Sequence, residues 1–270
     1  MMDQIIPTLL SAALYLLAGA GFAWRHVSGP ERVPWRHLLL AAGWLGVIVH
    51  AFALWQTMGA AHGLDLGFFN AASLVAALMV LIVLLGALRR PVENLMVFIL
   101  PVAALLQITN QALGSDAATI TRFPAGLEVH VISSVLAFSV LSIAVVQSLV
   151  LAWQDHRLRH RQPGGIVRAL PPLREMEQLL FQILWLGFIL LTLALASGAA
   201  YLQDIFSQHL VHKTAFSIAA WLLFATLLFG RWHYGWRGPT AIRWTLGGFA
   251  TLLIAYFGTK FVLELILGRG

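Results

Sequence analysis

The sequence predicts an all-α membrane protein, a polytopic bundle of about eight transmembrane helices with both termini outside. Of its 270 residues, 60% are hydrophobic and only 10% are charged, whereas soluble proteins carry about 25% charged residues. The mean hydropathy is +0.83. A soluble domain could not cover so much apolar surface. We therefore expect the lipid bilayer to be the main partner of this chain.

Eight segments are long and apolar enough to cross about 30 Å of hydrocarbon. None of them alternates as a barrel strand does, so each is expected to be a helix. The first has no basic residues before it and should remain as a span rather than be cleaved as a signal peptide. Together they form a single transmembrane domain over residues 1–270. The expected spans are 4–24, 37–58, 67–88, 92–112, 127–153, 175–200, 212–231 and 240–267.

Orientation follows from the basic residues, which gather in cytoplasmic loops of membrane proteins. Most of the Lys and Arg fall in alternate loops, at 25–36, 89–91, 154–174 and 231–243. These loops are predicted to face the cytoplasm, which places both termini outside. The formal charge of +6 is therefore a topology signal, and we expect no nucleic acid partner because no recognition motif accompanies it. The 154–174 loop is predicted to separate a group of five spans from a group of three.

The chain contains no cysteine. Disulfides, thiolate metal sites, iron–sulfur clusters and covalent haem attachment are thereby excluded. No nucleophile stands beside an evident general base, and no phosphate-binding loop is present. We therefore expect a protein that is not an enzyme.

Histidines are the main candidates for chemistry, because ionisable groups at membrane depth are costly and often functional. Five of the ten are predicted to lie in the outer half of the membrane: His50, His62, His130, His209 and His212. His130 opens the fifth span and His212 opens the seventh at the same side. His209 and His212 are three residues apart and would share one face of a helical turn.

Three readings of these histidines are open from the residues alone. Neutral imidazoles from two helices are what bis-axial haem iron needs, with small residues at 198–200 and aromatic ones at Tyr201, Phe206, Trp221 and Phe224 to surround a ring. The same histidines with Asp204 could bind zinc or another divalent ion. Alternatively, each histidine forms a hydrogen bond across a helix interface.

Other polar groups have simpler expected roles. A cluster at the end of the fourth span is predicted to form hydrogen bonds between helices: Gln107, Thr109, Asn110 and Gln111. Serines in the fifth span are expected to bond back to backbone carbonyls: Ser133, Ser134, Ser139 and Ser142. Lys260 and Glu264 are four residues apart in the last span and are expected to pair with each other.

Three stretches resemble the cytochrome c assembly membrane-protein family, which includes CcsA-type, HemX-like and YpjD-like proteins. The first begins His130-Val-Ile-Ser-Ser and the second His212-Lys-Thr-Ala-Phe. The third runs from Gly235-Trp236-Arg237-Gly238 to Tyr256-Phe257-Gly258. The chain is most similar to the YpjD-like inner-membrane branch, since it lacks the Trp-rich segment of the haem handlers and the second outer histidine that follows their last span.

The resemblance implies an eight-span bacterial inner-membrane protein that holds haem b at its outer face and assists cytochrome c or haem-protein assembly or haem transport. His130 carries over as a haem-iron ligand. Our own inference adds His212, or His209 in its place, as the second ligand. Trp221 and Tyr201 are expected to pack the porphyrin, and Lys213 or Lys260 to pair with a propionate. Other haem-handling or membrane proteins are expected partners.

The rival interpretation is a non-haem accessory or transporter-like membrane protein. In that case the outer histidines bind a metal ion or only hold helices together. The missing Trp-rich segment favours this rival.

Overall fold

The structure is a computed structural model. It describes residues 2–29, 34–60, 63–90, 92–114, 120–121, 127–160, 164, 167, 170–201 and 208–258. Contacts between these residues divide them into two compact units, which we call unit 1 and unit 2.

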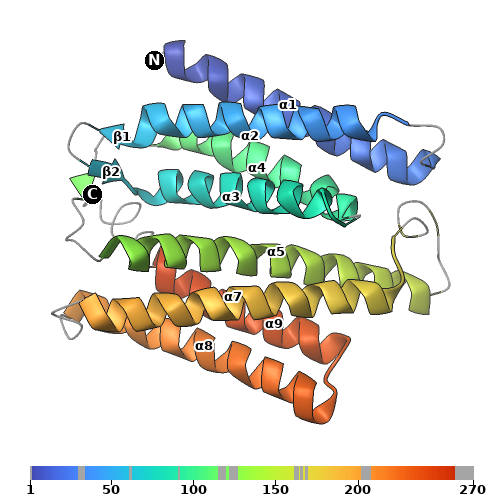
Figure 1. Cartoon of the computed structure of the whole chain (residues 1–270), viewed down its shortest axis with the longest axis vertical. Helices are drawn as coiled ribbons and strands as arrows, with labels where there is room; N and C mark the ends of the chain where they lie inside the picture. The colour runs from blue at the N-terminus through green and yellow to red at the C-terminus, as the bar shows by residue number, and fades with distance from the viewer. Residues whose placement is uncertain are drawn as a thin grey trace. The chain divides into compact units, whose positions relative to one another are not determined.

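Unit 1 consists of four long helices and a small antiparallel sheet (Figure 1). The sheet has the strand order β1-β2-β3, and it pairs Leu64 with both Gly59 and Thr121. Four pairs of helices are in contact: α1 with α2, α2 with α3, α3 with α4, and α1 with α4. The elements are α1 (Met2–Ser28), α2 (Arg36–Met58), β1 (Gly59–Ala60), β2 (Gly63–Asp65), α3 (Phe68–Ala87), α4 (Glu93–Leu113) and β3 (Ile120–Thr121).

The core of unit 1 depends on close approach between helices. Tyr15 of α1 is fully buried. A Cβ on Gly46 of α2 would lie 2.8 Å from two carbons of the Tyr15 ring, so only glycine leaves room for the ring at this crossing. Small residues allow such approach in membrane helices generally. Arg36 and Glu93 form an ion pair between the starts of α2 and α4.

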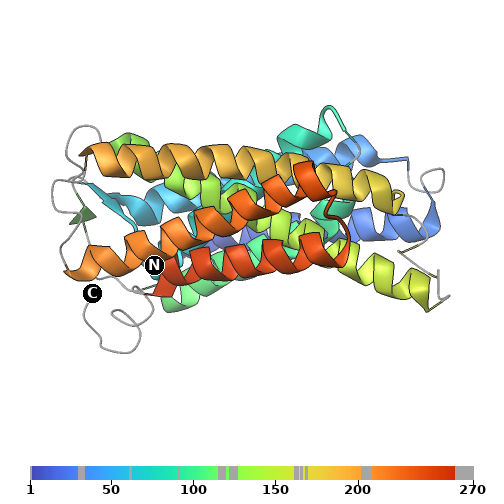
Figure 2. The same ribbon diagram turned by 90° about the horizontal axis from the view of Figure 1, so that it is seen from below.

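Unit 2 contains most of a long helix and a three-helix group that follows it (Figures 1 and 2). The helix α9 begins at a proline after Gly238, which has a positive φ of 55°. Its last turn continues as a π-helix. The elements are α5 (Leu127–Arg159), α7 (Leu173–Tyr201), α8 (Gln208–Tyr234), α9 (Pro239–Leu253) and η1 (Ile254–Gly258).

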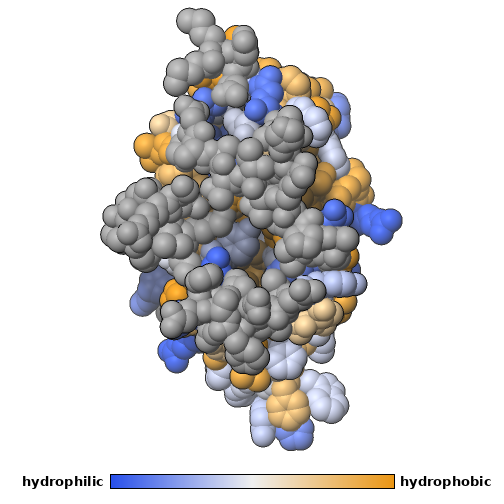
Figure 3. Space-filling view, turned by 90° about the vertical axis from the view of Figure 1, so that its left-hand side faces the viewer, coloured by the Kyte–Doolittle hydropathy of each residue, from blue (hydrophilic) through white to orange (hydrophobic). Residues whose placement is uncertain are grey.

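Eight helices among the described residues are long and apolar enough to span a membrane, as expected. Large hydrophobic side chains are exposed on their sides, for example Leu17 (68%), Ile48 (62%) and Leu105 (62%). Hydrophobic side chains appear in orange around the rim of Figure 3, where the sides of the helices come into view. A surface of this kind fits lipid rather than water. The chain is therefore a multi-pass membrane protein.

The grouping of the spans differs from the expected five and three, because α5 belongs with the last helices. Phe138 of α5 packs on Phe249 of α9, with ring centroids 5.0 Å apart. Gln147 of α5 donates from Nε2 to the carbonyl oxygen of Met176 in α7, at 2.9 Å. The helix also continues beyond the expected end at 153, as far as Arg159, because a charged segment can stay helical after the apolar span ends.

Candidate functional site

The first turn of α5 carries His130, whose ring is held by α7. Its Nδ1 lies 2.7 Å from the carbonyl oxygen of Ala194. Because a carbonyl oxygen can only accept a hydrogen bond, Nδ1 carries the ring proton and donates it. In the neutral imidazole the lone pair is then on Nε2.

The close contact between His130 and α7 depends on Gly198, one turn after Ala194. A Cβ on Gly198 would lie 2.9 Å from both Cε1 and Nδ1 of His130. Any larger residue would therefore push the ring away. The small residues at 198–200 were expected to leave room for a porphyrin ring, whereas the space at Gly198 is taken by the imidazole ring of His130.

The second ring nitrogen of His130 is available. Within the described ranges Nε2 has no hydrogen-bond partner, and the side chain is only half-buried. Metal-ligating histidines almost always donate their other ring N–H to a carboxylate, a backbone carbonyl or a water. The hydrogen bond to Ala194 has this form. His130 thus fits the role of a neutral imidazole ligand.

The other histidines expected at this site lie on α8. His212 is exposed, and the neighbouring Lys213 is half-buried. His209 belongs to the first turn of α8, but its side chain is outside the described part. The start of α8, the start of α5 and the end of α7 lie at one end of unit 2 (Figures 1 and 2). The described contacts of the His130 side chain are with α7, and none joins it to His212.

Trp221 joins α8 to α7 below the level of His130. Its Nε1 donates to Thr192 Oγ1 at 2.9 Å. Its ring stacks on Phe188, with centroids 5.4 Å apart and 25° between the planes. Both partners precede Gly198 by about two to three helical turns. The Trp221 side chain therefore contacts α7, further from the end of the helix than Gly198 and His130.

Tyr201 and Lys260 were also expected at the haem site. Tyr201 is the last residue of α7, one turn after Gly198, and 52% of it is exposed. It is the aromatic residue nearest in the chain to the glycine that contacts His130. Lys260, together with its expected partner Glu264, lies outside the described residues, as do Asp204 and His62.

An aromatic group on α5, α9 and η1 was not assigned a role from the sequence. Phe138, about two turns after His130, packs against Phe249, Tyr256 and Phe257 with centroids 5.0 to 5.4 Å apart. The half-buried aromatic side chains of the Tyr256-Phe257-Gly258 motif thus pack against α5 within unit 2. The motif could be recognised in the sequence, but a sequence does not show which helix its aromatic side chains pack against.

The described residues include no group of three or more His, Cys, Asp or Glu side chains that could hold a metal ion. A protein site for a lone divalent ion usually needs three or four such ligands. Haem iron needs only one or two histidines, since the porphyrin supplies the others.

His50 was grouped with the outer histidines, but it is a buried residue of unit 1. It is 0% exposed and lies between Tyr15 of α1 and Ser73 of α3, with a hydrogen bond to each. Three of the four polar residues expected to form hydrogen bonds between helices do so here: Gln107 accepts from Ser11, Asn110 donates to Asn70, and Gln111 accepts from Thr8. The fourth, Thr109, donates instead to a carbonyl oxygen of its own helix.

Comparison with known proteins identifies relatives over most of the chain. The model of the cytochrome C assembly protein family matches residues 38–267. The inner membrane protein YpjD of Escherichia coli K12 is 31% identical over 238 residues, which cover 86% of this chain and 89% of that protein. A 28.8 kDa protein from the nifR3-like 5′ region of Azospirillum brasilense is 30% identical over 282 residues, covering 99% of this chain and 100% of that one.

A shorter match is to a protein whose name states that it acts in cytochrome c biogenesis. The cytochrome c biogenesis protein CcsA of Prochlorococcus marinus MIT 9515 is 30% identical over 90 residues, 33% of this chain and 29% of that protein. No solved structure matches the chain.

Proposed function

Because the chain belongs to the cytochrome c assembly protein family, we propose that it binds haem at the outer face of the bacterial inner membrane and assists assembly of cytochrome c or other haem proteins. The observation that carries this proposal is the state of His130. Its Nδ1 donates a hydrogen bond to the carbonyl oxygen of Ala194, and its Nε2 has no hydrogen-bond partner in the described structure.

His130 supplies the first iron ligand. The hydrogen bond to Ala194 fixes the tautomer and the ring direction, and it raises the basicity of the ligating nitrogen. Gly198 leaves the space in which the ring sits. Since both contacts come from α7, the relative position of α5 and α7 sets the direction of Nε2.

His212 supplies the second ligand, with His209 as the alternative one turn away. His212 opens α8 at the end of unit 2 where α5 begins, and its side chain is exposed. Tyr201 at the end of α7 packs one face of the porphyrin, and Trp221 supports the wall beneath it. Lys213 or Lys260 pairs with a propionate.

The proposed chemistry is ligation and transfer, not bond cleavage, so the protein is not an enzyme. Haem b, when bound, would supply an iron that takes histidine ligands. His130 and His212 would hold that iron, and the exposed position of His212 would leave it within reach of an acceptor protein. The acceptors are other haem-handling or membrane proteins, in line with the biogenesis process named for CcsA.

The outer location is supported by charge. Arg231, Arg237 and Arg243 lie at the α8–α9 turn, at the far end of α8 from His212. Basic residues favour the cytoplasmic side, so the end of unit 2 that carries His130 and His212 faces outward. The name of the relative YpjD, an inner membrane protein, agrees with a location in the inner membrane.

The test is the absorption spectrum of the detergent-purified protein after expression with ample haem. A six-coordinate haem gives a sharp reduced α-band and a shifted Soret band. We expect the His130→Ala, His212→Ala double variant to lose the bands, while His233→Ala, at the other end of α8, keeps them. An unchanged spectrum in the double variant would reject this site.

The rival, a non-haem accessory protein, has one observation in its favour. The hydrogen bond from His130 to Ala194 joins α5 to α7, which is a sufficient structural role for a histidine. This rival predicts a colourless protein that also fails to take up added hemin, and a His130→Ala variant that unfolds at a lower temperature.

A further inference from the structure

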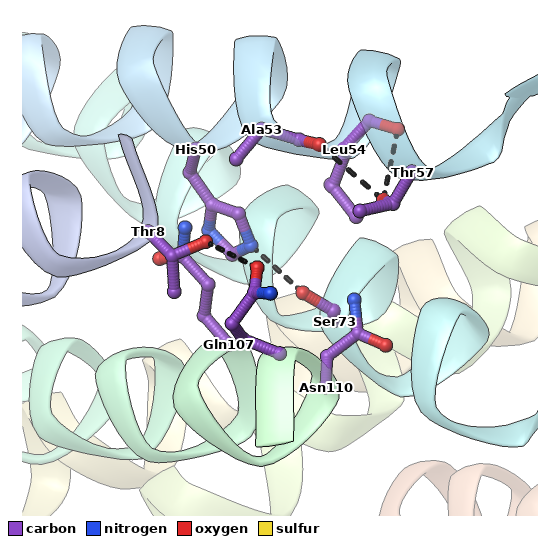
Figure 4. A pocket seen from close by; sticks show the side chains of 9 residues that line it. Thr8, His50, Ala53, Leu54, Thr57, Ser73, Gln107 and Asn110 are labelled. Atoms are coloured by element: carbon purple, nitrogen blue, oxygen red, sulfur yellow. Dashed lines mark hydrogen bonds between the residues drawn. The ribbon is translucent and has the colours of Figure 1, made fainter. Parts of the chain in front are cut away.

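Unit 1 contains a small polar cavity between its four helices, near the ends of α2 and α4 (Figure 4). Its volume is about 10 Å³, which is the space that one water molecule needs. His50 of α2, Ser73 of α3 and Gln107 of α4 are among its lining residues, and each is at most 3% exposed. Polar groups buried this deeply in a membrane helix bundle need partners.

The hydrogen bonds of His50 determine where its proton lies. Nδ1 is 3.2 Å from the hydroxyl of Tyr15, and Nε2 is 2.9 Å from the hydroxyl of Ser73. A neutral imidazole donates from one nitrogen and accepts at the other. If Nδ1 donated, the buried Tyr15 hydroxyl proton would have to find another acceptor, and Tyr15 does not line the cavity. Tyr15 therefore donates to Nδ1, and Nε2 donates to Ser73.

This tautomer leaves the hydroxyl proton of Ser73 without an acceptor in the described part of the chain. Ser139 on α5 shows the usual solution, since its hydroxyl donates at 2.8 Å to the carbonyl oxygen of Val135, four residues earlier. No such bond is made by Ser73, which lines the cavity. A buried donor thus faces a space of about one water molecule.

Gln107 presents a second unsatisfied group. Its Oε1 is 2.6 Å from Ser11 Oγ, and its Nε2 has no hydrogen-bond partner. If the amide were turned by 180°, Nε2 would donate to Ser11, and Ser11 would donate to the carbonyl oxygen of Thr8 at 3.1 Å. Oε1 would then be the unpaired atom. Either way one buried amide atom of Gln107 remains to be satisfied, and only a ligand that both donates and accepts suits both cases.

We propose that this cavity is a binding site for one water molecule, held by Ser73 and Gln107. Ser73 donates to the water oxygen, and Gln107 makes the second hydrogen bond. Thr57, whose hydroxyl itself donates to backbone carbonyls of α2, and Asn110 also line the cavity, and each carries an oxygen that can accept a hydrogen bond from the water. Buried waters typically make about three such bonds.

The water also joins two hydrogen-bonded chains. One runs from Asp65 of β2 to Asn70 at 3.0 Å and from Asn70 to Asn110 at 3.0 Å. The other runs from Ser73 through His50 to Tyr15. With the water between Asn110 and Ser73, a continuous polar chain extends from a carboxylate at the sheet to a tyrosine of α1.

The direct test is a structure of the full-length protein at a resolution that shows ordered water. We expect a water peak at hydrogen-bonding distance, about 2.7–3.2 Å, from both Ser73 Oγ and the Gln107 amide. An empty cavity in a well-resolved map, or a Ser73 hydroxyl turned to its own helix backbone, would overturn the proposal. Haem content does not enter this test, so it stands or falls separately from the proposed function.

A second test uses magnetic resonance of the ¹⁵N-histidine-labelled protein in bilayers. We expect His50 to be protonated on Nε2 and its signal to correlate with a water proton. Thr57→Val removes one acceptor and should reduce that correlation several-fold. Thr109→Val on α4 is the matched control, because Thr109 does not line the cavity and bonds only to its own helix. Protonation on Nδ1, or no water correlation in the unmodified protein, would contradict the proposal.

Discussion

His130 lies so close to Gly198 that a methyl group at residue 198 would be 2.9 Å from two atoms of the imidazole ring. The same turn of α7 supplies the carbonyl oxygen of Ala194, which accepts the Nδ1 proton at 2.7 Å. The backbone of α7 thus fixes both the position and the tautomer of His130. Any haem-binding role of this histidine depends on α7 as much as on α5.

We predict that Gly198→Ala weakens haem binding without removing a ligand. The added methyl group displaces the imidazole from Ala194, and loss of such a supporting contact typically costs 10- to 100-fold in metal affinity. Hemin titration of the purified variant, followed at the Soret band, measures the change.

Gly247→Ala is the control for this prediction. A Cβ at Gly247 meets nothing within 4 Å, so the same substitution should leave haem affinity unchanged. Equal haem affinity in the Gly198→Ala variant and the unmodified protein would show that His130 does not ligate the iron through this geometry.

His50→Ala should destabilise the protein strongly. The change leaves the buried hydroxyl groups of Tyr15 and Ser73 without their partner, at about 1–3 kcal/mol each, and opens a cavity. We expect the free energy of unfolding to fall by about 3–5 kcal/mol, measured by denaturant unfolding in detergent. His37→Ala, at the exposed start of α2, should change it by less than about 0.5 kcal/mol.

The eight helices could be predicted from the sequence because hydropathy and length alone determine whether a segment can span a bilayer. Three of the four serines expected to bond to their own helix could be predicted for a similar local reason: Ser133, Ser139 and Ser142 each bond to a carbonyl oxygen four residues earlier, whereas Ser134 shows no such bond. Such features need only neighbours in the chain, and no knowledge of the partner helix is required.

Partners far apart in the sequence could not be predicted. In a helix that is apolar on all sides, periodicity does not indicate which face meets protein and which meets lipid. The contact of His130 with Gly198 and that of His50 with Tyr15 both fall in this class. The three-stranded sheet was missed because its strands have only two or three residues each, too few for a period-2 pattern.

Glu177 is predicted to stabilise the start of α9. Its Oε1 accepts a hydrogen bond of 2.6 Å from the backbone N–H of Gly238, the residue that precedes the first turn of the helix. Loss of an intramolecular hydrogen bond typically costs about 1 kcal/mol. We expect Glu177→Ala to lower the unfolding temperature by several degrees, whereas Glu175→Ala, exposed on the same helix, should not. The same unfolding temperature for both variants would mean that the contact contributes nothing.

Trp221 and Thr192 should be energetically coupled across α7 and α8. Trp221→Phe keeps an aromatic ring against Phe188 but removes the indole donor, and Thr192→Val removes the acceptor. Hydrogen bonds between membrane helices contribute about 0.6 kcal/mol on average. A double-mutant cycle in detergent should therefore give a coupling energy of about 0.5–1 kcal/mol. If the stability losses of the two single variants simply add in the double variant, the hydrogen bond between Trp221 and Thr192 contributes nothing to stability.

The same two variants test whether Trp221 also contacts haem. A tryptophan that only joins α7 to α8 predicts equal hemin affinities for Trp221→Phe and Thr192→Val, because each removes one end of the same hydrogen bond. If Trp221 packs the porphyrin, as the sequence predicts, Trp221→Phe alone should weaken hemin binding and shift the Soret band. The difference between the two variants thus separates the cofactor role of the indole from its structural role at this helix interface.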